Sequence, residues 1–87
     1  MNELQTSQLT LQVYLDIIVK KARVFEEITA LVLPEVETIN IETEPITVVV
    51  NIPNAEGTTD PDQEILERVK ADINRCTGVL NVKVSAN

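Results

Sequence analysis

Residues 11–33 read LQVYLDIIVKKARVFEEITALVL, and the assignment of this segment governs the architecture of the whole chain. Wound as an α-helix at about 100° per residue, it aligns apolar side chains at alternating spacings of four and three, which is typical of a helix packed on a core. This first stripe consists of Leu11, Leu15, Ile18, Ala22, Phe25 and Val32. Pro34 ends the helix, because proline lacks an amide hydrogen and restricts the residue before it.

A second apolar stripe lies beside the first on the same predicted helix. It consists of Tyr14, Ile17, Val24, Ile28 and Leu31. Together the two stripes span roughly 200°, whereas a helix that packs on one core needs only about 100° or somewhat more. A chain of 87 residues buries only a little over ~60% of its unfolded surface, so oligomerisation is the expected supplement to its core. We therefore predict that the second stripe contacts a partner.

The start of this segment also fits a β-strand. Leu9, Leu11, Val13 and Leu15 alternate with other residues, so residues 8–15 could form a strand that leads into a shorter helix. The helix is favoured, because the spacing of four and three continues unbroken through Val32. In the strand alternative Tyr14 leaves the second stripe.

The rest of the chain predicts a hairpin, a helix and a final strand. Residues 36–52 are β-branched and alternating, with a turn near Glu44 and Pro45. Asp60 is the expected N-cap of the next helix, with Pro61 at its first position. The buried stripe of that helix comprises Ile65, Leu66, Val69, Ile73 and Cys76. Gly78 suits the helix C-terminus, and residues 79–84 follow as a strand with Leu80, Val82 and Val84 facing inward.

The predicted fold is an α+β two-layer sandwich in the order α-β-β-α-β, with a long N-terminal helix and a three-stranded mixed sheet. Residues 1–8 are expected to form a flexible arm and residues 9–87 a single domain. Both helices cover one face of the sheet. The bare face is a second possible partner surface and carries Thr47, Val49, Val79, Asn51, Asn81 and Lys83.

Composition excludes several classes of protein. The net charge of −7 repels phosphate backbones and anionic headgroups, so we expect neither nucleic acid nor membrane as a partner. Charged residues within residues 11–33 argue against a membrane span. The chain has one cysteine and no histidine, so an intrachain disulfide and an ordinary zinc or copper site are not expected. No secretion signal is visible, which predicts a cytoplasmic or other intracellular location.

Catalysis and cofactors are likewise not expected. The usual histidine base is missing, and Cys76 lies on an apolar stripe near a helix C-terminus, where a thiolate is disfavoured. Oxygen ligands for a hard cation occur around Gly57, at Asn54, Glu56, Asp60 and Asp62. A solvated loop and a helix cap also explain all of these residues. The alternative function is therefore a small ligand- or cation-binding domain that uses the acidic loop at residues 54–64.

The C-terminal stretch from Glu67 to Ala86 reads ERVKADINRCTGVLNVKVSA and resembles the end of the alkaline-shock protein family, in which a helix ending in T-G precedes a closing V-x-V strand. The BON domain is similar in its closing G-V-x-x-V. The likeness is carried by Thr77, Gly78, Val79, Val82 and Val84. Both resemblances imply non-enzymatic binding or scaffolding. Small βαβ domains with a helical arm also resemble accessory parts of phage tails and capsids, by analogy of fold alone.

The function that these observations predict is a non-enzymatic structural or assembly module. It self-associates as a homo-oligomer or docks on a larger protein complex, such as a phage virion, through the surplus face of its N-terminal helix.

Overall fold

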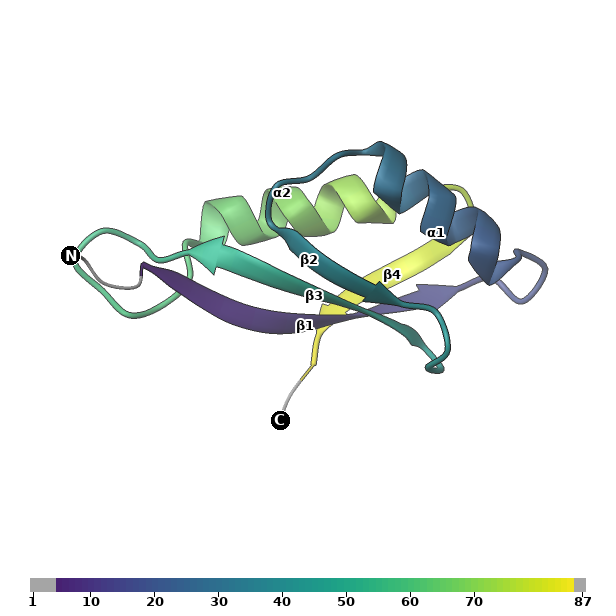
Figure 1. The fold of residues 1–87 in the computed structure, drawn as a ribbon, viewed down its shortest axis with the longest axis horizontal. Coiled ribbons are helices and arrows are strands. Elements are labelled where there is room, and N and C mark those ends of the chain that lie inside the picture. The colour runs from purple at the N-terminus through teal and green to yellow at the C-terminus, as the bar shows by residue number, and fades with distance from the viewer. Residues whose placement is uncertain (1–4, 86–87) are drawn as a thin grey trace.

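The computed structural model describes residues 5–85, which form four strands and two helices in the order β-α-β-β-α-β (Figure 1). The elements are β1 (Thr6–Leu15), α1 (Lys21–Ala30), β2 (Val36–Asn40), β3 (Ile46–Pro53), α2 (Gln63–Asn74) and β4 (Val79–Val84). The strands form one antiparallel sheet in the order β2-β3-β1-β4. Both helices lie on the same side of this sheet in Figure 1. This is the ferredoxin-like, or split βαβ, topology.

The long helix predicted over residues 11–33 is wrong, because residues 11–15 belong to strand β1 and only Lys21–Ala30 form helix α1. Leu11 and Val13 follow the period of two, and both side chains are fully buried on the face that the helices cover. Strand β1 is central. It pairs with β3, placing Leu11 opposite Val48, and with β4, placing Val13 opposite Val82. The pairing with β3 covers Thr6–Val13 and the pairing with β4 covers Leu11–Leu15, so every residue of β1 has a partner strand on at least one side, and the strand alternative for residues 8–15 is the correct one.

The predicted three-stranded mixed sheet is also wrong. Strands β3 and β4 run parallel to each other, as a crossover through α2 requires, but β1 lies between them and is antiparallel to both. All neighbours in the sheet are therefore antiparallel. Of the arm expected at residues 1–8, residues 6–8 belong to β1, whereas residues 1–4 lie outside the described residues.

A tight turn separates β1 from α1. The carboxylate of Asp16 accepts the amide of Ile18 at 3.2 Å, and its carbonyl accepts the amide of Val19 at 3.1 Å. Such aspartate turns are common where a chain reverses. The Asp16 amide donates to the Gly78 carbonyl at 2.8 Å, which ties the turn to the residue before β4. Ile17 and Ile18 are thereby held at the tip of the turn.

The core lies between the helices and the covered sheet face. Its buried residues are Leu11, Val13, Val24, Ile28, Ile46, Val48, Val50, Ile52, Leu66, Val69, Ile73, Cys76 and Val82. The predicted hairpin, second helix and last strand lie where the sequence places them. The predicted cap of α2 does not: Asp62 accepts the amides of Glu64 and Ile65 at 2.9 and 3.3 Å, so it is the N-cap in place of Asp60.

Candidate functional site

Exposed apolar side chains gather at the end of the sheet where β1 turns into α1 and β4 begins. Ile17, Ile18 and Leu80 are 94%, 85% and 63% exposed. We call these three residues the apolar end. A single exposed leucine or isoleucine needs no explanation, but a cluster of such side chains is typical of a contact surface.

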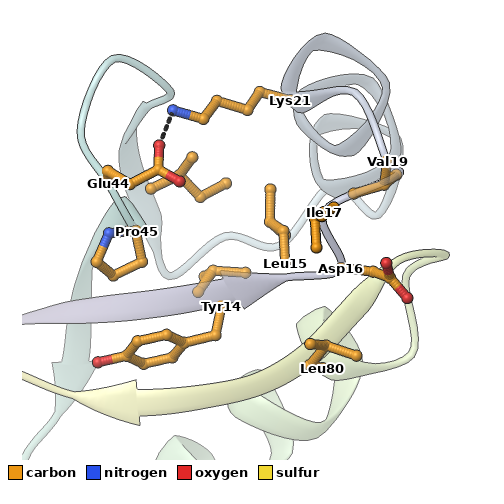
Figure 2. Close-up of a pocket in the computed structure, with 11 residues that line it drawn as sticks. Tyr14, Leu15, Asp16, Ile17, Val19, Lys21, Glu44, Pro45 and Leu80 are labelled. Carbon is orange, nitrogen blue, oxygen red and sulfur yellow. Dashed lines mark ion pairs between the residues drawn. The ribbon is translucent and has the colours of Figure 1, made fainter.

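An open groove of about 600 Å³ borders the apolar end (Figure 2). Its lining residues are Val13, Tyr14, Leu15, Asp16, Ile17, Val19, Lys21, Glu44, Pro45, Ile46 and Leu80. The ammonium of Lys21 lies 2.6 Å from the Glu44 carboxylate and donates to the Thr43 carbonyl at 3.2 Å, so α1 is tied to the turn between β2 and β3. With this lysine paired, the groove offers mainly apolar contacts.

The structure separates the five residues predicted to contact a partner. Tyr14 and Ile17 line the groove, but Val24 and Ile28 are 0% and 2% exposed and pack in the core. Leu31 lies elsewhere, in a shallow depression between α1 and the end of α2 beside Cys76. Val24 and Ile28 therefore present no surface to a partner, because α1 uses them to bind its own sheet.

Two residues of the apolar end are absent from the predicted contact set. The sequence pattern assigns Ile18 to the helix stripe that faces the core, and Leu80 to the inner face of the last strand. A signal for Ile18 exists in the sequence, because an aspartate two residues earlier favours a turn. The register of β1 and β4 shifts between Tyr14 and Leu15, which leaves Leu80 without an opposing residue and displaces it from its expected position. The sequence does not reveal this irregularity.

The uncovered face of the sheet is polar. The predicted bare-face residues Thr47, Val49, Asn51, Asn81 and Lys83 lie on it, whereas Val79 packs against the core. Side chains on this uncovered face are hydrogen-bonded to one another. Gln8 and Asn51 both donate to the Glu37 carboxylate, at 2.9 and 2.8 Å.

The predicted cation loop is held by hydrogen bonds within the loop and to strand β1. The Asn54 side chain accepts the Ser7 hydroxyl, Asp62 caps α2, and the Ala55 amide donates to the Asp60 carbonyl at 2.9 Å. Glu56 and Asp60 are exposed. Within residues 5–85, no group of three or more His, Cys, Asp or Glu side chains is placed to hold a metal ion.

Cys76 is buried at the end of α2. Burial raises the pKa of its thiol, and the negative charge of Glu27 raises it further. Both effects favour the protonated, unreactive thiol.

Comparisons of the chain with protein-family models, curated proteins and solved structures find no match. The resemblance of residues 67–86 to the alkaline-shock and BON families stays a prediction. Neither helix in the described part of the chain has the length and apolar character needed to cross a membrane.

Proposed function

We propose that this chain is a non-enzymatic structural module that assembles with protein through the apolar end. The observation that carries the proposal is the exposure of Ile17, Ile18 and Leu80 together at one end of the sheet. These side chains are held in place, because the turn that presents them is hydrogen-bonded to Gly78. The groove beside them has room for apolar side chains of a partner.

The chemistry of this surface favours protein over other macromolecules. The net charge of −7 disfavours phosphate-bearing partners, and the lysine of the groove is already paired with Glu44. A place in a larger assembly, such as a virion accessory component, is compatible with the proposal and rests on analogy of fold alone.

Burial of the apolar end alone does not supply enough free energy for stable association. Full burial of an isoleucine or leucine contributes about 1.5–3 kcal/mol, so three side chains supply on the order of 5–9 kcal/mol. Association costs about 4–15 kcal/mol in lost translational and rotational freedom. The apolar end is therefore the anchor of a larger contact.

The proposal is tested by the double variant Ile17→Asn and Ile18→Asn, analysed by sedimentation velocity over a range of concentrations. We expect the wild-type chain to associate and the double variant to remain a monomer with unchanged secondary structure. The matched control is Val32→Asn, because Val32 is 81% exposed at the other end of α1, and its φ of 51° suits asparagine. Equal association of the wild-type chain, the double variant and the control would show that the apolar end is not part of the contact.

A further inference from the structure

We infer that the partner is a second copy of this chain, and that the two copies pair edge to edge through antiparallel β4 strands related by a two-fold axis at Val82. This inference rests on the proposed function and names its partner. It joins two four-stranded sheets into one continuous sheet across the interface.

The free edge of β4 is shown by its hydrogen bonds. The Ser85 amide donates to the Thr10 carbonyl of β1 at 2.8 Å. In an antiparallel strand the backbone N–H and C=O groups of successive residues point alternately to the two sides. The backbone groups of Lys83 therefore also point toward β1, whereas those of Val82 and Val84 point away from it. The Val82 amide accordingly donates to the side chain of Asn81, at 2.9 Å, and not to another strand.

The two edges of the sheet differ in charge. Acidic residues surround β2, at Glu35, Glu37, Glu42 and Glu44. Glu44 and Glu35 are ion-paired with Lys21 and Arg68, but Glu37 and Glu42 still present negative charge to a second acidic chain. Strand β4 carries one charged residue, Lys83, and two apolar side chains that remain exposed, Leu80 at 63% and Val84 at 37%. The β4 edge is thus the edge at which two chains of net charge −7 can approach.

The sequence of β4 is complementary to itself in one register. With the two-fold axis at Val82, the backbone position of Leu80 lies opposite Val84 of the second copy, so the two exposed apolar residues of β4 become neighbours across the interface. Asn81 then lies opposite Lys83 of the second copy. A shift of the axis to residue 83 would place the two Lys83 side chains opposite each other, and like charges in that position repel.

Helix α2 adds charge complementarity beside this edge. Glu67 and Lys70 line a shallow groove of about 250 Å³ between α2 and β4, together with Asn81 and Val82. Within one chain the Lys70 ammonium lies 3.4 Å from the Glu67 carboxylate. Two-fold pairing of β4 brings the two α2 helices together in antiparallel directions, so Glu67 of one copy approaches the Lys70 region of the other. On pairing, the Val82 amide exchanges its hydrogen bond to the Asn81 side chain for a backbone hydrogen bond to β4 of the second copy.

The register is tested by disulfide cross-linking of the single variants Asn81→Cys and Lys83→Cys. Positions 81 and 83 form a non-hydrogen-bonded pair between copies, with Cα atoms about 4.5 Å apart, which is within the range that a disulfide spans. An oxidised mixture of the two variants should yield a covalent heterodimer, identified by mass spectrometry, and each variant alone should yield none. The wild-type chain is the control for Cys76, which is only 8% exposed.

A second measurement uses the wild-type chain without substitution. Amide hydrogen exchange at Val82 and Val84 should slow at least tenfold between dilute and concentrated solutions, whereas exchange at the β2 edge should stay constant. Exchange at Val82 and Val84 that is independent of concentration, in a chain that does associate, overturns the β4 pairing and leaves the proposed function intact. Cross-linking of Lys83→Cys with itself overturns the register. A wild-type chain that is monomeric at all concentrations overturns the second copy as the partner, and the proposed function is overturned only if such a chain also binds no other protein.

Discussion

Gly78 is the single residue on which the apolar end depends most directly. Its φ of 88° lies in the left-handed region, and a Cβ atom there would lie 2.5 Å from Cγ2 of Val19. Its carbonyl accepts the amide of Asp16. The residue therefore allows the left-handed backbone directly before β4, leaves room for Val19 at close range and fixes the turn that carries Ile17 and Ile18.

We predict that Gly78→Ala lowers the free energy of unfolding by about 2–4 kcal/mol, because about 1–2 kcal/mol of backbone strain adds to the steric clash. The control is Gly57→Ala. Gly57 has a similar φ of 79°, but nothing lies within 4 Å of the position that a Cβ atom would take there, so only the strain is expected. Urea unfolding of both variants measures the difference. Equal losses would show that the contact with Val19 is unimportant.

Among the secondary-structure elements, β1 shows where sequence reasoning reaches its limit. Residues 9–15 satisfy both a period of two and the helical spacing that continues to Val32, so local pattern alone cannot choose between them. The choice is made by strands β3 and β4, which are distant in sequence and pair with β1 on both sides. The hairpin, α2 and β4 carry one unambiguous period each and are predictable for that reason.

The assignment of β1 is tested by comparing Val13→Ala with Ile18→Ala. In the predicted helix Ile18 faces the core and Val13 belongs to neither stripe, whereas in the structure Val13 is fully buried and Ile18 is exposed. We expect Val13→Ala to lose about 2 kcal/mol of stability, from lost burial and a residual cavity, and Ile18→Ala to change it by less than about 0.5 kcal/mol. Thermal or urea unfolding reports both values, and the reverse order would support the long helix.

Helix α2 allows a similar comparison at its N-terminus. The Asp62 carboxylate accepts two amides of the first turn, so Asp62→Ala should lower stability by about 1 kcal/mol. Asp60, the cap that the sequence pattern favours, is exposed, and Asp60→Ala should have an effect within about 0.5 kcal/mol. A larger loss for Asp60→Ala in urea unfolding would contradict the observed cap.

For the whole molecule, the sequence indicates surplus apolar surface but does not locate it. Ile17 lies outside the core, whereas Val24 and Ile28 are core residues, because α1 is shorter than predicted and binds the sheet with the side chains that the sequence pattern assigns to a partner. With residues 6–15 in a strand, the exposed apolar surface lies at the turn that follows. Strand topology, which depends on distant pairing, thus determines the candidate site.

The apolar end adjoins the start of the β4 edge, since the amide of Asp16 is hydrogen-bonded to Gly78 directly before β4. Together they offer apolar anchors and a row of backbone donors and acceptors to the same partner. A domain of this size buries a modest core, and association adds buried surface without a longer chain.

Assembly is tested most directly by the mass of the wild-type chain in solution, measured by light scattering during size-exclusion chromatography at increasing concentration. Two-fold pairing of β4 predicts a rise toward twice the chain mass of 9.7 kDa, with no larger species. A mass of 9.7 kDa at every concentration would contradict self-association of the chain, and continued growth beyond the dimer would contradict the two-fold pairing.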